Sequence, residues 1–329
     1  MRNVEFETIP TVPTADEVLD RSLRRAAAKK KLKTNVDTAN EEFVRAVAKA
    51  IHDKLKSVVS SFPSFERLSP FYQEAADILV SLDRLKRSLG AVNWAADQIW
   101  VIGSGYARSM RSGVDTPPKR RQAVARIASI VHQVEDDLVY LNEARNILRK
   151  LPHVNDDDFT VVVAGFPNVG KSSFIRLVST AEPEIAAYPF TTKGIVVGHR
   201  EIGKRDRIQF IDTPGVLERP ADERNPIERQ AVSAIINTAD VVLFILDASE
   251  HCGYSLDDQN RLLEEVHRLV DVPVVTVANK SDIRGIEGYP AMSTLTGEGV
   301  GAVLDLLLAF RKEATKTNLR EPPQPETQE

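Results

Sequence analysis

The segment Gly165-Phe-Pro-Asn-Val-Gly-Lys-Ser172 has the spacing G-x-x-x-x-G-K-[ST] of a phosphate-binding loop. Its two glycines let the backbone curl so that N–H groups point at phosphates, at the positive end of a following helix. Lys171 is expected to reach the β- and γ-phosphates, and the Ser172 hydroxyl is expected to bind Mg²⁺. The predicted phosphate-binding residues are Gly165, Phe166, Pro167, Asn168, Val169, Gly170, Lys171, Ser172 and Ser173.

A second segment, Asn279-Lys280-Ser281-Asp282, indicates which base is bound. The Asp282 carboxylate can accept hydrogen bonds from N1–H and the exocyclic amino group of guanine, whereas adenine lacks this pair of donors. Asn279 would bond the other side of the ring, and the stem of Lys280 would cover one face. The predicted guanine-binding residues are Asn279, Lys280, Ser281, Asp282, Ser293 and Thr294.

Two segments between these motifs are expected to sense the γ-phosphate. Asp212 should hold Mg²⁺ through water, and the Gly215 N–H should contact the γ-phosphate. Either Thr191 or Thr192 can complete the Mg²⁺ shell, and Thr192 is favoured. The predicted metal ligands are Ser172, Thr192 and Asp212; the predicted switch residues are Thr191, Thr192, Asp212, Thr213, Pro214, Gly215 and Val216.

The elements that position these residues alternate between strand and helix, which predicts a doubly wound, mostly parallel sheet. The expected strands are 160–164, 194–197, 208–211, 241–246, 272–277 and 291–293. The runs 194–202 and 206–211 are too close for a helical crossover, so they should form an antiparallel hairpin at one edge. We therefore expect an α/β P-loop GTPase domain with a six-stranded sheet over residues 158–312. Only 283–288 separates the guanine motif from the last run, so the usual helix there should be missing or a single turn.

The first half reads as helix, which predicts an all-α bundle with long hairpin helices over residues 1–157. The spacings Thr14–Glu17 and Thr38–Glu41 predict capping boxes. A helix should begin at Ser69-Pro70 and stop near Gly90, and another should follow from Trp94. The longest should run from about 117 to 151. The polar, proline-rich residues 313–329 are expected to be disordered.

Composition excludes several classes of protein. The chain has 329 residues, one cysteine and a net charge of −4, and it contains no apolar run long enough to span a membrane. No apolar signal core follows the N-terminus and no lipidation motif ends the chain, so a cytoplasmic protein without membrane attachment is expected. Residues 1–150 carry a net charge of +6 and residues 151–329 carry −10, which suggests different partners for the two halves.

Several segments together resemble the nucleolar GTP-binding protein (Nog-type) family of Obg-related GTPases. They are the phosphate-binding loop, Tyr188-Pro-Phe-Thr-Thr-Lys193, Val197-Gly-His199, Asp212-Thr-Pro-Gly-Val216, Ser249-Glu-His-Cys-Gly-Tyr-Ser255, Phe62-Pro63, Pro70-Phe71-Tyr72 and Leu89-Gly90. The resemblance covers roughly residues 6–310 and implies a role in assembling the large ribosomal subunit. It implies that the helical domain contacts rRNA and ribosomal proteins. We also expect no DNA partner and a monomer away from the ribosome. The chain ends soon after the GTPase domain, which resembles archaeal members and makes a nucleolar location less expected.

Hydrolysis is expected to be slow without help. Ras-like enzymes carry a water-orienting glutamine directly after the glycine of D-x-x-G, and here Val216 occupies that position. In similar GTPases with a P-N-V-G-K-S loop, the asparagine helps to hold K⁺, so Asn168 either does this or only stabilises the loop. Arg219 and Arg224 are alternative charge donors. The expected catalytic residues are Lys171, Thr192, Gly215 and Asn168.

Basic clusters in the first half are the candidate RNA contacts: Lys29, Lys30, Lys31, Lys33, Lys119, Arg120 and Arg121. The leading hypothesis is a ribosome-assembly GTPase that uses GTP, GDP and Mg²⁺. The alternative is a scaffold that binds GTP with negligible turnover and whose helical half is a protein-interaction module. His199, His251 and His267 are expected to be structural.

Overall fold

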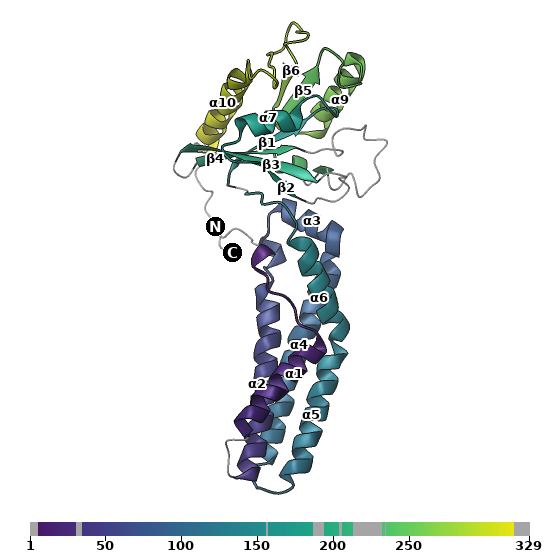
Figure 1. The fold of residues 1–329 in the computed structure, drawn as a ribbon, viewed down its shortest axis with the longest axis vertical. Helices are drawn as coiled ribbons and strands as arrows, with labels where there is room; N and C mark the ends of the chain where they lie inside the picture. Colours follow the sequence, from purple (N-terminus) through teal and green to yellow (C-terminus); the bar gives the residue numbers. More distant parts are fainter. Residues whose placement is uncertain are drawn as a thin grey trace, which may run out of the picture. The chain divides into compact units, whose positions relative to one another are not determined.

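The computed structural model describes residues 6–30, 35–155, 157–186, 194–203, 206–212, 232–233 and 235–318 (Figure 1). The chain separates into two compact units. The first contains Met1–Leu68 and Leu79–Arg149, and the second contains Ser69–Ile78 and Lys150–Glu329. Within the described residues, no helix is both long and apolar enough to cross a bilayer.

The first unit is built from helices. They are α1 (Ala15–Lys30), α2 (Val36–Ser61), the last residues of α3 (Pro70–Val80), α4 (Leu82–Ser109), α5 (Thr116–Gln133) and α6 (Glu135–Leu148), with short 3₁₀ turns at Phe6–Thr8 and Phe65–Arg67. Figure 1 shows α2, α4 and α5 running side by side, and α1 packs against α2 and α5. Fully buried apolar residues such as Ile51, Leu55, Leu85, Ile99 and Ile127 form the core, which confirms the predicted all-α bundle.

One predicted helix cap is present and the other is replaced. Thr14 and Glu17 form the expected capping box, in which each backbone N–H donates to the other side chain at 3.3 Å. The second cap is Asn35, whose Oδ1 accepts from the N–H groups of Asp37 and Thr38. The helix therefore begins at Val36, before the predicted Thr38–Glu41 box, because Asn at the N-cap satisfies the first free N–H groups just as well.

The helix boundaries around Gly90 differ from the sequence expectation. The chain breaks at Ser81, whose φ is +53°, and α4 then runs straight through Gly90 to Ser109. The buried stripe on α4 continues across that glycine, so tertiary packing outweighs its weak helix propensity. The predicted 117–151 helix is likewise divided at Val134, which separates α5 from α6, and α4 is longer than either.

The second unit contains a six-stranded sheet in the order β2-β3-β4-β1-β5-β6. The strands are β1 (Phe159–Ala164), β2 (Glu184–Ala186), β3 (Ile195–Gly203), β4 (Asp206–Asp212), β5 (Val241–Asp247) and β6 (Val274–Asn279). The pairs β1–β4, β1–β5 and β5–β6 are parallel, whereas β3 is antiparallel to both of its neighbours. The mostly parallel sheet with an antiparallel hairpin towards one edge is thus confirmed. The helices α7 (Lys171–Val178), α9 (Leu256–Leu269) and α10 (Val300–Asn318) accompany the sheet.

The sixth strand is not the one expected. Residues 291–293 form only an isolated bridge, between Ala291 and Ala278, and the short strand Glu184–Ala186 pairs with β3 instead. A strand of three residues, such as Glu184–Ala186, is too short to show a recognisable alternation of apolar and polar residues in the sequence. The segment after the guanine motif forms turns, as expected, and α10 begins only at Val300.

Tyr72 ties α3 to the segment that leads into β1. Its hydroxyl accepts from the Val154 N–H at 2.9 Å and lies 3.0 Å from the Pro152 carbonyl oxygen. The buried Gln209 side chain in β4 then holds Asn155 through both its backbone N–H and its carbonyl. Residues 69–78 therefore belong physically to the sheet-containing unit, although they lie within the helical half of the sequence.

The variant Tyr72→Phe should lower the free energy of unfolding by about 1–3 kcal/mol, because the buried Val154 N–H would lose its acceptor. Urea denaturation followed by circular dichroism measures this change. Tyr289→Phe is the matched control, since Tyr289 lies in the same unit and its hydroxyl has no hydrogen bond to a described residue. Equal midpoints for the two variants would show that the Tyr72 hydroxyl contributes nothing.

Candidate nucleotide-binding site

The phosphate-binding loop lies between β1 and α7, as its sequence predicts. Gly165 and Gly170 have φ values of +133° and +107°, and a Cβ at either position would collide with Ile245 or Asn279. Lys171 is buried, and its ammonium group donates to the carbonyl oxygens of Gly165 and Phe166, each at 2.9 Å. These two hydrogen bonds hold the Lys171 side chain against the backbone of the phosphate-binding loop.

Ser172 and Asp212 form an oxygen pair next to this loop. The Ser172 hydroxyl donates to Asp212 Oδ2 at 2.5 Å, and Asp212 is fully buried at the carboxyl end of β4. A hydroxyl and a carboxylate are the hard oxygen ligands that Mg²⁺ prefers, so these two residues fit the ion that the sequence implies. No cluster of three His, Cys, Asp or Glu side chains suited to a metal occurs in the described part of the chain.

Asn279 connects three parts of the site. Its amide donates to the Val169 carbonyl at 2.7 Å and to the Thr294 hydroxyl, and its Oδ1 accepts from the Thr294 N–H. The buried Ser293 hydroxyl accepts from the backbone N–H groups of Leu295 and Thr296, two and three residues further along the loop. The guanine motif, the phosphate-binding loop and the Ser-Thr turn are therefore brought together at the carboxyl edge of the sheet, where ligands bind in folds of this class.

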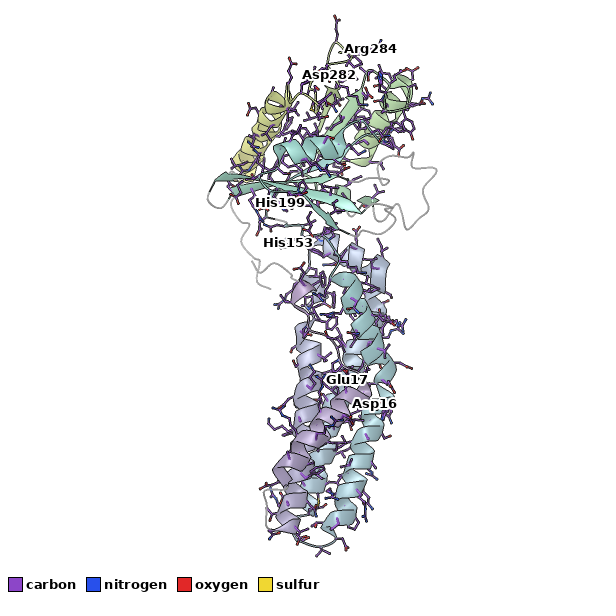
Figure 2. The ribbon with its side chains drawn as sticks, in the orientation of Figure 1. Asp16, Glu17, His153, His199, Asp282 and Arg284 are labelled. Atoms are coloured by element: carbon purple, nitrogen blue, oxygen red, sulfur yellow. The ribbon has the colours of Figure 1, made fainter. Side chains whose placement is uncertain are left out.

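Asp282, which the sequence predicts to recognise the base, is described by the structure. It lies in the turn after β6, beside Arg284 in the view of Figure 2. Its carboxylate is exposed and makes no hydrogen bond or ion pair with any described residue. It is therefore available to a ligand, whereas the neighbouring Ser281 is held through its N–H by the Met292 carbonyl.

A buried carboxylate that the sequence analysis did not single out lies between these parts. Asp247, at the end of β5, accepts from Lys280 Nζ at 2.6 Å and from the N–H groups of Ser249 and Cys252. Burial alone would raise the pKa of the Asp247 carboxyl, but these hydrogen bonds hold it below its ordinary value. The available signal was an acidic residue ending an apolar strand, directly before the segment 249–255.

Several predicted residues lie outside the described residues: Thr191, Thr192, Thr213, Pro214, Gly215, Val216, Lys31 and Lys33, together with the side chains of Lys29 and Lys30. Asn168 is described. It is exposed at the tip of the phosphate-binding loop with a φ of +62°, a left-handed conformation that asparagine tolerates better than most residues.

The three basic residues at the start of α5 differ in their contacts. Lys119 Nζ donates to the carbonyl oxygens of Ser109 and Val114, and Arg120 donates to Asn40 Oδ1 at 3.0 Å. Arg121 is exposed and makes no hydrogen bond or ion pair with the described residues. Only Arg121 of the three therefore presents an uncommitted cation.

His199 lies on β3. His199 pairs with Gln209 in the β3–β4 register, three residues before Asp212 on β4. Burial lowers the pKa of His199, and Arg207 lowers it further against the opposing effect of Asp158. Figure 2 shows it near His153, within the same unit. Burial also raises the pKa of the Cys252 thiol, as expected of a packed cysteine.

Comparison with known proteins matches both halves of the chain. Residues 6–155 match a family described as the NOG1 N-terminal helical domain, and residues 160–280 match one described as a 50S ribosome-binding GTPase. An uncharacterized protein of Methanocaldococcus jannaschii is 40% identical over 84% of this chain and 81% of its own length. Nucleolar GTP-binding protein 1 of Drosophila melanogaster is 34% identical over 87% of this chain and 45% of its own length.

The chain thus spans most of one relative but about half the length of the nucleolar one. A crystal structure assigned to nucleolar GTP-binding protein 1 of Plasmodium falciparum is 30% identical, covering 51% of this chain and 94% of that chain at a TM-score of 0.46. A helical domain of the NOG1 type is followed by a P-loop GTPase domain with its motifs in order. The chain therefore belongs to the nucleolar GTP-binding protein (Nog-type) family of GTPases.

Proposed function

We propose that the protein binds GTP and GDP with Mg²⁺ and hydrolyses GTP to GDP and phosphate as a molecular switch. The observation that carries this proposal is the joint placement of three groups at one sheet edge: the phosphate-binding loop, the Ser172–Asp212 pair and the uncommitted Asp282 carboxylate. The Asn279 bonds to Val169 and Thr294 join the guanine motif to the phosphate-binding loop and to the Ser-Thr turn.

The residues divide the work of binding and catalysis. The loop N–H groups and the Lys171 ammonium neutralise charge on the β- and γ-phosphates, in a buried position where such interactions are strong. Ser172 and Asp212, with Thr192, would hold Mg²⁺, which when bound neutralises charge on the phosphate oxygens. Gly215 would donate its N–H to the γ-phosphate, and the segments carrying Thr192 and Gly215 would respond to its loss.

The attacking water lacks the usual glutamine, because Val216 cannot form a hydrogen bond to it. We propose that Asn168 supports a K⁺ ion against the phosphates; in support, its side chain is exposed at the tip of the phosphate-binding loop. GTP turnover should then be about 10²-fold faster in KCl than in NaCl, which is the size expected for one added charge donor. Asn168→Ala should abolish the difference between the salts.

Phosphate release at matched ionic strength measures this effect. Equal rates in the two salts would contradict the K⁺ role. Tight GTP binding without turnover in either salt would favour the scaffold function instead, for which the observation is Val216 in place of glutamine.

We further propose that this switch acts in assembly of the large ribosomal subunit, with the helical domain meeting rRNA and ribosomal proteins. Support comes from the family described as a 50S ribosome-binding GTPase and from relatives named as nucleolar GTP-binding proteins. The net positive charge of residues 1–150 suits a partner rich in phosphate.

Arg121→Glu should weaken association with large ribosomal subunits about tenfold, because the variant replaces an exposed cation by an anion near RNA phosphates. Co-sedimentation at several salt concentrations measures it, and the variant should also show a shallower salt dependence. Arg261→Glu on α9 is the control: it has the same charge change at a side chain that is 76% exposed, but it lies in the acidic domain. Equal binding by the two variants would argue against contact at Arg121.

A further inference from the structure

The segment 248–254 follows β5 and is organised by the carboxylate of Asp247, which is fully buried. Asp247 Oδ1 accepts from the Ser249 N–H at 3.0 Å and from its hydroxyl at 2.5 Å, and Oδ2 accepts from the Cys252 N–H at 2.8 Å. The side chain of buried Gln259 holds the backbone of Asp247: its Oε1 accepts from the Asp247 N–H, and its Nε2 donates to the Asp247 carbonyl oxygen. One carboxylate therefore fixes the path of this segment, which we refer to as the clasp (residues 248–254).

The clasp reaches the phosphate-binding loop through an aromatic pair. The ring of Tyr254 stacks on the ring of Phe166, with centroids 4.1 Å apart and planes 24° apart. Phe166 is buried, and its carbonyl oxygen accepts from the ammonium group of Lys171. A displacement of Tyr254 would therefore remove the outer support of a loop residue that itself positions the catalytic lysine.

The same carboxylate also reaches the guanine motif. Lys280 has a left-handed backbone, with φ of +59°, and its ammonium lies 2.6 Å from Asp247 Oδ2. The backbone and the ammonium group of Lys280 are therefore both held in place. The aliphatic stem between them has a defined direction beside the predicted base-recognition residues. The lysine is thereby held ready to cover the base before any nucleotide arrives, which reduces the entropy lost on binding.

We propose that Asp247 is a positioning residue for guanine nucleotides, which orients Lys280 for the base and, through the clasp and Tyr254, supports the phosphate-binding loop. The inference rests on the proposed GTP-binding function. This role of residue 247 requires a negatively charged side chain and not merely a polar one. An asparagine could still accept from Ser249, but its amide would place donors against the Lys280 ammonium and the Cys252 N–H.

The test measures the affinity and release rate of a fluorescent GDP analogue. Asp247→Asn should raise the Kd about ten- to a hundredfold, mostly through faster release, because it leaves the part-buried Lys280 ammonium unpaired. Asp240→Asn is the matched control, because Asp240 directly precedes β5, at the opposite end from Asp247. Its carboxylate accepts one hydrogen bond from the Thr160 N–H, which an asparagine oxygen can keep, so its Kd should equal that of wild type.

A double-mutant cycle separates positioning from general loosening of the fold. Because Asp247 acts on the base through Lys280, the effects of Asp247→Asn and Lys280→Met on the Kd should be less than multiplicative. As a single variant, Tyr254→Ala should also speed GDP release. The Tyr254 side chain is partly exposed, so this variant should still fold. If Asp247→Asn does not fold, Tyr254→Ala and Lys280→Met decide the question, since each must speed release.

Three results would overturn the inference: a Kd for Asp247→Asn within twofold of the control, independent multiplication of the two effects, or unchanged release from Tyr254→Ala. Failure of the wild-type protein to bind the GDP analogue would instead contradict the proposed function, so the two failures are distinguishable.

Discussion

Asp282→Asn should raise the Kd for GDP and GTP about a thousandfold while improving binding of the xanthine nucleotides. The wild-type carboxylate is exposed and free of partners among the described residues, so it can accept two hydrogen bonds from the N1–H and amino group of guanine. Each charge-assisted bond contributes about 1.5–3 kcal/mol, and each 1.4 kcal/mol is tenfold in affinity. Xanthine carries an oxygen in place of the amino group, and the asparagine amide can donate to it.

Competition against a fluorescent GDP analogue measures both changes for Asp282→Asn. Asp271→Asn is the control, because this exposed carboxylate lies before β6, at the opposite end from Asp282. A GDP Kd unchanged in Asp282→Asn would mean that the base is recognised elsewhere.

Lys171→Ala should slow GTP hydrolysis about 10²- to 10³-fold, the range found when one preorganised donor to a developing charge is removed. Lys171 is 5% exposed, and its ammonium group is held by the carbonyl oxygens of Gly165 and Phe166. Single-turnover phosphate release measures the rate. The control is Arg176→Ala, which removes an exposed cation farther along the same helix, α7. Comparable rates in the two variants would remove Lys171 from the mechanism.

The architecture of the second half follows from local sequence patterns. Apolar runs such as 160–164 and 241–246 are buried on both faces, so they must be central parallel strands. The connection 203–205 is too short for a helical crossover, so the runs on either side of it must form a hairpin. The motifs could be placed because each follows such a strand. The break at Ser81 was not predictable, because it depends on tertiary packing that also carries α4 through Gly90.

The sequence predicts the motifs of the candidate site but not the hydrogen bonds that join them. The residues of the phosphate-binding loop and the guanine motif are recognisable by type and spacing. The bonds of Asn279 to Val169 and Thr294, and those of Asp247 to Lys280, join residues from separate strands and loops. Such long-range pairs leave no periodic or compositional trace in a single sequence, so only the folded structure reveals them.

Single-turnover hydrolysis of GTP and ATP, with Mg²⁺ and K⁺ present, is the decisive test of the proposed function. We expect GTP to be converted to GDP and phosphate and ATP to be left intact, because adenine lacks the two donors that pair with Asp282 and would leave this carboxylate unpaired. Equal conversion of ATP, or bound GTP that yields no GDP even with large ribosomal subunits added, would contradict it.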